Sequence, residues 1–463
     1  MKNKHVSGYL PDETPEFLEL IAFALQQIVV MFPATVLVAL ITGFHVSTTI
    51  FASGLATLAF ILVTGRKIPL YYGSSFSYIA AIASIMSADA FASYSLNDKI
   101  SIAQFGIIMS GFVSIIAGYI IKKSGKAFID KVLPATVTGS IAIIIGLSLS
   151  ANAMGNASAI PSTVAEGSQS LATSLAWVIA LITLISTILY SVYLKGKLSQ
   201  LPILFGLLTG YVSALIIGAS TGIQFVNFNT ITSAGILNLP IFTFPKPSLA
   251  AVIAIMPIAI ATIPESTAHI YQLDIYVNDL ARKKGSTKKY DLENKLGLNL
   301  IGDGIGDIVS GLIGGPAGTN YGENISAMAI SKNFSVPVLI AAAILTMIIS
   351  MFTPLINVVY SIPTAVIGGL SIYLFGVIAA QGITIMMDKK VDMFSSKNLA
   401  VIAVILIVGL GGSFNFEGGM IPMFGTQLPA IATAAIVGIT LNLMLSIGDS
   451  KESAADAASE EIA

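Results

Sequence analysis

The chain has 463 residues, of which 55% are hydrophobic and only 10% are charged, and its mean hydropathy is +0.87. Soluble domains carry about 25% charged residues, so this composition predicts a polytopic membrane protein and excludes a soluble one. The net charge of −1 argues against a nucleic-acid partner, and the lack of cysteine excludes disulfides and thiol chemistry.

The chain opens with a short polar tail and continues as a series of apolar segments. Residues 1–17 begin with Lys2, Lys4 and His5, then turn acidic, and do not resemble a cleavable signal, so we expect a cytoplasmic N-tail. A bilayer core requires about 20 apolar residues per helix. Breaks at charged residues, glycine, proline and asparagine then give fourteen expected spans, at residues 18–41, 46–64, 68–86, 101–121, 132–150, 171–194, 201–219, 248–272, 296–314, 316–331, 336–357, 361–386, 398–413 and 427–447.

The basic residues test this division. If both termini are cytoplasmic, 21 of the 23 Lys and Arg residues lie in cytoplasmic loops or tails, and only Lys99 and Lys246 do not. The positive-inside rule predicts such an asymmetry. The basic run at residues 282–289 is interpreted as a topology determinant, with lipid head-group binding as the alternative. Residues 448–463 are expected to be a disordered, acidic cytoplasmic tail.

Two matches indicate an internal repeat. The Pro, Val and Gly of residues 133–139 recur with the same spacing in residues 362–368, and Pro264 follows Pro33 by 231 residues. Together these matches predict two halves of seven spans. An odd number of spans forces the halves into opposite orientations, and inverted repeats with a site at their interface are common in secondary transporters.

The third and tenth spans are expected to be broken helices. Each runs for seven residues from a proline, Pro69 or Pro316, through Gly, Ser, Thr, Asn and Tyr to Phe76 or Glu323. These residues are mostly poor helix formers. Unwound backbone at membrane depth is tolerated only where protein or water satisfies it, and a pair of interrupted spans indicates a binding site. The alternative is a kinked helix packed tightly on its neighbour.

Two acids interrupt the apolar sequence in this part of the chain, Glu265 in the eighth span and Glu323 in the tenth. A carboxylate at membrane depth costs about 2.5–3.5 kcal/mol on insertion scales and usually marks a transport path. Phe76, Tyr78 and Tyr321 add aromatic faces, and the third, eighth and tenth spans hold no basic residue before the loop that follows, which disfavours an anion. A planar heterocycle with N–H donors and a cation both fit this chemistry.

Further polar residues accompany the two glutamates. His269 follows Glu265 by four residues and shares its helix face, which predicts a proton-handling pair, with a structural hydrogen bond as the alternative. Asp303 and Asp307 are again four residues apart in the ninth span. Bonding at a helix end or between helices is the alternative for both aspartates.

At these residues the chain resembles the nucleobase/ascorbate transporter family and, within it, the bacterial uracil permeases. The likeness covers nearly the whole length, including residues 25–38 and 67–76, and its most specific stretch is residues 320–325. The family signature opens with Glu-Asn in uracil permeases and with Gln-Asn in xanthine and urate carriers. Glu323 followed by Asn324 therefore implies a pyrimidine substrate.

The resemblance implies an all-α fold of 14 transmembrane segments arranged as two inverted seven-span repeats. Short antiparallel strands would lie in the broken third and tenth spans. A core domain, residues 18–121 and 248–357, would move against a gate domain, residues 132–219 and 361–447. The expected partners are a small-molecule nucleobase, the lipid bilayer and, through the gate domain, a second copy of the chain.

The resemblance also implies roles for particular residues. No cofactor or metal is expected, and H⁺ is the expected coupling ion, with Na⁺ left open. The substrate would contact Glu265, Glu323, Phe76 and Gly322, and Tyr321 would offer it an aromatic face. Proton coupling would involve His269, Asp303 and Gln27, and support would come from Ser75 and Asn324.

Three departures from the family pattern bear on coupling and packing. Gln27 stands where uracil permeases usually have histidine, and Ser326 stands where the signature usually has glycine. Between Glu265 and His269 the usual intervening histidine and glycine are replaced.

The sequence therefore predicts a proton-coupled importer of uracil or a closely related pyrimidine in a bacterial inner membrane, and not an enzyme. The alternatives are a purine (xanthine-type) symporter and an anion transporter of the same fold. An intramembrane enzyme and a channel are disfavoured, because the sequence holds no further catalytic motif and no filter motif.

Overall fold

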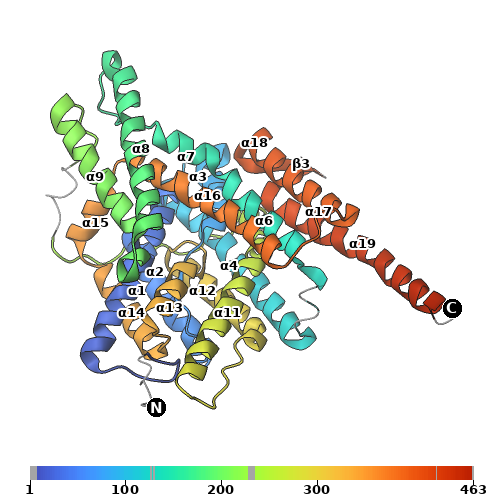
Figure 1. Ribbon diagram of the computed structural model, residues 1–463. Coiled ribbons are helices and arrows are strands. Elements are labelled where there is room, and N and C mark those ends of the chain that lie inside the picture. Colours follow the sequence, from blue (N-terminus) through green and yellow to red (C-terminus); the bar gives the residue numbers. More distant parts are fainter. Residues whose placement is uncertain (1–7, 126–127, 129–130, 228–234, 424, 461–463) are drawn as a thin grey trace.

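The computed structural model describes residues 8–125, 128, 131–227, 235–423 and 425–460, and it is mostly helical (Figure 1). The helices of the first half are α1 (Phe17–Thr42), α2 (Val46–Val63), α3 (Ile79–Ser87), α4 (Leu96–Ser124), α6 (Ala135–Ser148), α7 (Ser150–Ala157), α8 (Gln169–Tyr193) and α9 (Pro202–Thr221). Those of the second half are α10 (Leu249–Ile255), α11 (Ile258–Lys283), α12 (Leu296–Ile313), α13 (Gly322–Ser331), α14 (Val336–Ile349), α15 (Thr353–Tyr360), α16 (Thr364–Asp388), α17 (Ser396–Leu406), α18 (Gly412–Asn415) and α19 (Ala430–Glu460). The strands are β1 (Tyr72–Ser74), β2 (Gly318–Asn320), β3 (Met420–Met423) and β4 (Thr426–Pro429).

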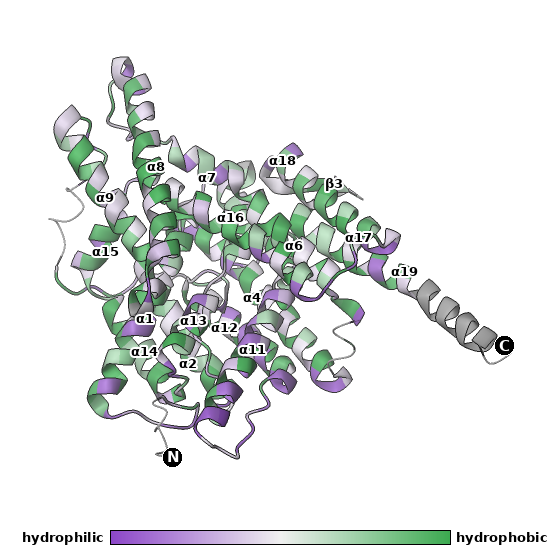
Figure 2. Ribbon diagram, viewed as in Figure 1, coloured by the Kyte–Doolittle hydropathy of each residue, from purple (hydrophilic) through white to green (hydrophobic). Residues whose placement is uncertain are grey.

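Apolar helices dominate the molecule. Among the described residues, ten helices are long and apolar enough to cross a membrane, and three shorter apolar helices cover Phe76–Ser87, Val336–Ile349 and Ala430–Ser446. Figure 2 shows hydrophobic residues along the helices and hydrophilic residues gathered in the loops near the N-terminus and the end of α11. These features belong to a multi-pass membrane protein.

Several expected boundaries need correction. The fourth span is longer than expected, because α4 begins at Leu96 and ends at Ser124. The eighth span is divided into α10 and α11. The break falls at Pro257, which has no backbone N–H to continue the helix. The C-terminal tail was expected to be disordered, yet α19 continues to Glu460. Its Ala and Glu residues are strong helix formers, and they extend a helix that membrane packing has already nucleated.

The helices pack as two groups. In one group α12 lies against α4 and α2, and α14 lies against α2 and α1; in the other, α16 lies against α6, α7 and α8, and α17 against α19 and α6. Figure 1 shows the second group as a band from α8 and α9 to α17 and α19, beside the first group. Glycines allow close crossings: a Cβ at Gly111 would lie 2.5 Å from Gly304 O, and one at Gly139 would lie 2.6 Å from Gly382 O.

The expected strands of the broken third and tenth spans are confirmed. β1 pairs antiparallel with β2, with Gly73 opposite Thr319. Two further backbone bonds extend the pairing, since Tyr321 N donates to Tyr71 O and Ser75 N donates to Ala317 O, both at 3.0 Å. The unwound backbone is thus satisfied inside the protein, which is the condition for its existence at membrane depth.

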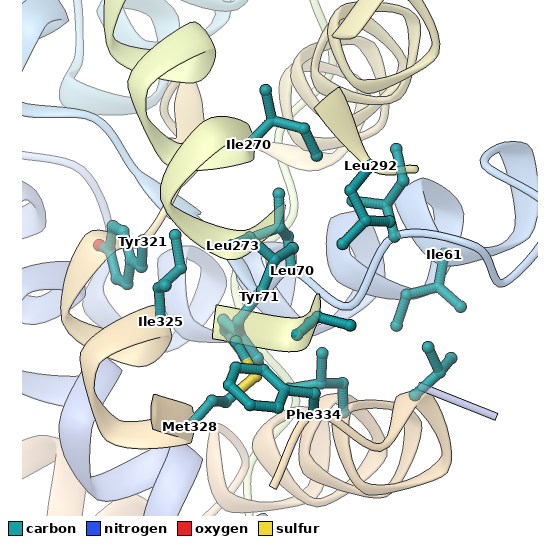
Figure 3. Close-up of a cluster of buried hydrophobic side chains, with 14 of the residues drawn as sticks. Ile61, Leu70, Tyr71, Ile270, Leu273, Leu292, Tyr321, Ile325, Met328 and Phe334 are labelled. Atoms are coloured by element: carbon teal, nitrogen blue, oxygen red, sulfur yellow. The ribbon is translucent and has the colours of Figure 1, made fainter. Parts of the chain in front are cut away.

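A hydrophobic cluster anchors the two strands from one side. Figure 3 shows Tyr71 and Leu70, just before β1, beside Leu273 of α11, and Ile325 and Met328 of α13 in the same cluster. All five side chains are buried. The cluster therefore joins both broken spans to α11, the helix that carries Glu265.

Candidate functional site

The polypeptide around the strand crossing is buried except at a few positions. Residues 68–75 and 77–79 are buried, as are residues 314–321 and 324–325. The residues that interrupt these two stretches, residue 76 in the first and residues 322–323 in the second, are partly exposed. The partly exposed positions of these stretches and of the facing part of α11 include Phe76, Glu265, His269, Gly322 and Glu323. Partial exposure inside buried elements indicates that these residues line an opening.

Glu265 and Glu323 face this opening from different helices. Glu265 lies in α11 directly after Pro264, and Ser77 Oγ donates to its Oε2 at 3.4 Å. Glu323 lies in the first turn of α13, where the helix dipole favours an acid. Both Glu323 and Asp303 are within electrostatic range of Glu265. The carboxyl groups of Glu323 and Asp303, from α13 and α12, thus lie near that of Glu265 from α11.

His269 lies one turn after Glu265 and touches the second broken span. Its Nε2 would be only 2.9 Å from a Cβ at position 322, so the ring can sit there only because that residue is Gly322. The ring also makes a hydrogen bond with the Asn320 backbone, while its Nδ1 is buried without a hydrogen-bond partner. The alternative of a structural hydrogen bond is therefore present, and the ring lies next to the opening as well.

Of the three aromatic side chains expected at the site, only Phe76 is partly exposed. Its ring makes an edge contact with Phe375 of α16, with 6.1 Å between centroids. Tyr78 is fully buried and bonds to Ser110 on α4, so it does not offer a face to a substrate.

Tyr321 is also turned away from the opening. Its side chain is 3% exposed, its OH donates to Ser74 O at 3.0 Å, and the same OH lies 3.0 Å from Thr35 Oγ1 of α1. The side chain of Tyr321 therefore connects α1 and β1 to the second broken span.

The remaining predicted residues form a buried layer behind the opening. Asp303 of α12 accepts a hydrogen bond from Ser266 Oγ at 2.6 Å, which ties α12 to α11 beside Glu265. Ser75 Oγ accepts from Ser77 N at 3.3 Å and caps the turn that presents Phe76.

Gln27 of α1 is tied to the second broken span. Asn324 Nδ2 donates to its Oε1 at 2.8 Å and to its backbone O at 3.0 Å. Gln27 is therefore attached to the residue after Glu323, and its side chain bonds with Asn324 rather than with His269 or Asp303.

Sequence reasoning gave no role at the site to Asp307 or Ser77. Asp307 accepts from Tyr72 OH and from Gly318 N at 2.8 Å, so it bonds to the two strands, whereas the alternative given for it was bonding at a helix end or between helices. Ser77 bonds to Glu265, and its only signal was its place in a run of Ser and Gly. Among the described residues, no group of three or more His, Asp or Glu side chains is placed to hold a metal ion.

A cavity of about 490 Å³ adjoins the site along α11. It touches Pro264, Thr267 and Ala268 on that helix, and Lys389 and Lys390 after α16. The cavity thus runs from the helix of Glu265 to the charged end of the second helix group.

Comparisons with known proteins agree with this architecture. The model of one protein family, described as "Permease family", matches residues 18–418. The chain is 35% identical over 440 residues to a uracil permease of Bacillus caldolyticus, covering 94% of this chain and 93% of that protein. It is 33% identical over 451 residues to a uracil permease of Bacillus subtilis (strain 168), covering 96% of each.

A solved structure shows the same fold. It is the murine Solute Carrier 26 family member A9 anion transporter in the inward-facing state, with a TM-score of 0.64 and 12% sequence identity. The match covers 94% of this chain and 69% of that chain. At this identity the likeness concerns the fold alone.

Proposed function

Because this chain belongs to the permease family, we propose that it is a secondary active transporter that imports uracil or a closely related pyrimidine across a bacterial plasma membrane. One observation supports the choice of substrate. Glu265 and Glu323, on separate helices, are both partly exposed and lie within electrostatic range of each other, and Phe76 is the only partly exposed side chain of the three aromatic ones expected there.

The site chemistry suits a flat, neutral ring. The carboxylates accept the ring N–H groups, and backbone N–H groups at the starts of the two half-helices, near Phe76 and Gly322, donate to the carbonyl oxygens. The ring of Phe76 covers one face. The names of the relatives support a permease rather than an enzyme and uracil rather than a purine.

The packing supports fourteen spans in two inverted repeats. Under such a repeat the fourth span, α4, is equivalent to the eleventh, α14, and the ninth span, α12, is equivalent to the second, α2. A contact of α4 with α12 therefore requires a contact of α14 with α2. Both contacts are present, and the contact of α1 with α14 likewise has its equivalent in that of α4 with α10. The two helix groups fit a core domain, α1–α4 with α10–α15, and a gate domain, α6–α9 with α16–α19.

The transport cycle would move the core domain against the gate domain. The cavity beside α11 lies between the groups and reaches Lys389 and Lys390, which the charge asymmetry assigns to the cytoplasm together with both termini. It provides a route from the site to that side. We place a second copy of the chain, if one binds, at the gate domain.

Coupling to protons fits the same cluster. Glu323 and Asp303 each repel the carboxylate of Glu265, and a bound cation relieves this repulsion. Carboxyl groups and His269 exchange protons readily, so H⁺ is the proposed coupling ion and Na⁺ the alternative. Gln27 is bonded to Asn324 rather than to His269. It would therefore hold the second broken span in position instead of carrying the proton itself.

The test is uracil uptake by cells that lack their own uracil permease. Glu265→Gln and Glu323→Gln should each abolish concentrative uptake while leaving the amount of folded protein unchanged, because an amide cannot replace a carboxylate acceptor. Glu166→Gln, which changes an exposed acid in a loop, is the matched control and should transport normally. Near-normal uptake by both site variants would contradict the proposal. Strong competition by xanthine would favour the purine alternative, and anion-dependent currents would favour the anion alternative.

A further inference from the structure

We propose that Asp307 is a positioning residue: its carboxylate fixes β1 to β2 and thereby sets the backbone at Phe76 and Gly322 for substrate. The inference deepens the proposed function, because its main readout is uracil binding.

One carboxyl oxygen of Asp307 receives donors from both strands. Tyr72 OH, from β1, and Gly318 N, from β2 at 2.8 Å, both donate to Oδ1. Asp307 lies on α12 and is 2% exposed, so neither bond competes with bulk water. Both bonds end on the same oxygen, so the side chain of Asp307 joins the two strands directly.

The ring of Tyr72 reaches Asp307 through a gap left by two glycines. A Cβ at Gly306 would lie 2.6 Å from the ring, and a Cβ at Gly318 would lie 2.3 Å from it. The ring is thus enclosed between α12 and the opposite strand. Its hydroxyl has little freedom to find another partner, so the contact with Asp307 is built into the packing.

A second tyrosine forms the reciprocal contact. The Tyr321 ring lies over Gly73 of β1, where a Cβ would be 2.3 Å from the ring, and its OH bonds to Ser74 O and Thr35. Each strand therefore has a glycine covered by a tyrosine from the other broken span. The two contacts differ in one respect: only the Tyr72 contact ends on a carboxyl group.

The position of this joint explains why it should affect substrate. Phe76 is two residues beyond the end of β1, and Gly322 is two residues beyond the end of β2. Both half-helices start there, so the strand crossing sets the direction of their N-terminal N–H groups. Binding constellations need to be held within about 0.5 Å of their productive geometry.

The experiment measures uracil binding by purified protein, with thermal unfolding of the same samples. Tyr72→Phe removes only the hydroxyl, and Asp307→Asn keeps the shape but replaces one carboxyl oxygen with an amide NH2 group. Each should weaken binding by about 3- to 10-fold, the range for one lost hydrogen bond of ordinary strength. The double variant should bind no more weakly than the worse single one, because both changes break the same joint.

The matched control is Tyr78→Phe, which removes the hydroxyl of an equally buried tyrosine whose partner, Ser110, lies on α4 rather than on a strand. It should change binding less than about threefold, whatever it does to thermal unfolding. Additive effects of Tyr72→Phe and Asp307→Asn, or unchanged uracil binding in both, would overturn the inference.

Failure of the proposed function can be distinguished from failure of the positioning role of Asp307. If the unaltered protein binds no uracil, amide hydrogen exchange provides the readout instead. Tyr72→Phe should then speed exchange at residues 71–75 and 317–321, and Tyr78→Phe should not. Equal exchange in Tyr72→Phe and the unaltered protein would overturn the positioning role.

Discussion

The two halves of the chain supply the opening with different chemistry at equivalent places. Pro264 precedes Glu265 in the second half, whereas Pro33 precedes Ala34 in the first. Seven residues after the proline of each broken span, the second half has Glu323 and the first has Phe76. Both acids at the opening therefore come from the second half, and the first half provides apolar surface and backbone. Under the proposed repeat, the two copies would share a backbone plan while only the second carries the acids.

The difference between the two halves is largest at the residue that follows the helix proline, which is Ala34 after Pro33 and Glu265 after Pro264. Ala34 is 2% exposed inside a packed core, whereas Glu265 is partly exposed at the opening. We expect the largest effect from Ala34→Glu, because it buries a charge that has no partner and costs several kcal/mol. Little folded protein should remain on size-exclusion chromatography in detergent.

The conservative control at this position is Ala34→Ser, which adds one hydroxyl and should give mostly folded protein. Normal folding of Ala34→Glu together with unchanged uracil uptake would mean that position 34 also faces water, and the contrast between the halves would be lost.

The next largest effect should come from the acid of the second broken span. Glu323→Ala removes a charged acceptor and should weaken uracil binding by about 100-fold or more, near the upper limit for a hydrogen bond to a charged group. Equilibrium binding to purified protein measures it. Glu417→Ala removes an exposed acid of a loop and should leave binding unchanged. If the two variants bind equally well, Glu323 does not contact the substrate.

The aromatic position of the first half should matter less. Phe76→Leu keeps the apolar surface but loses the aromatic face, whose contacts contribute about 0.5–1.5 kcal/mol, so binding should weaken by about 2- to 12-fold. Phe91→Leu is the control, because Phe91 also makes an edge contact with another ring, that of Tyr94, at 5.6 Å between centroids. An effect of Phe76→Leu as large as that of Glu323→Ala would contradict the division between the halves.

The sequence predicted the long helices because the length of an apolar run reflects bilayer thickness. It also identified the broken spans, since Gly, Ser and Pro at membrane depth indicate irregular backbone. The directions of Tyr78 and Tyr321 were not predictable, because irregular backbone has neither the helix nor the strand periodicity that assigns a side chain to a face. The structure shows the Tyr78 hydroxyl bonded to Ser110 of α4 and the Tyr321 hydroxyl bonded to Ser74 and Thr35.

Two other features were missed for different reasons. β3 lies between two expected spans and β4 overlaps the start of the last one, and such short strands give too little alternation to be recognised. The bond from Asn324 to Gln27 joins residues 297 positions apart, so no local pattern could indicate it.

The first half also supports the second mechanically, outside the membrane. Tyr9 N donates to Lys332 O and Phe334 N donates to Tyr9 O, both at 2.8 Å, so the N-terminal segment pairs with the connection after α13. Beside it, Asp12 Oδ2 accepts from Lys288 Nζ at 2.7 Å, and Asp12 Oδ1 accepts from Tyr290 OH. These bonds hold the far end of the half-helix that begins at Gly322.

The smallest expected effect is at this attachment. The hydrogen bond from Lys288, and then that from Tyr290, lower the pKa of Asp12 below its usual value. The stabilisation is therefore complete above the unfolded pKa of about 3.9 and is lost as the pH falls through the lower folded pKa. Asp12→Asn should reduce the free energy of unfolding at pH 7 by less than about 1 kcal/mol, because the pair is half exposed and screened by solvent.

Thermal unfolding across pH separates this attachment from a local charge effect. The gap between the unaltered protein and Asp12→Asn should stay constant down to about pH 4 and narrow only as the pH falls below the unfolded pKa of about 3.9. Asp279→Asn is the matched control, because it removes ion pairs with Arg282 and Lys283 at one end of α11 and breaks no bond between the halves. Both variants should lose little stability, but only Asp12→Asn should speed hydrogen exchange of the amides of residues 9 and 334. Equal exchange in the two variants would mean that the N-terminal segment does not support the second half.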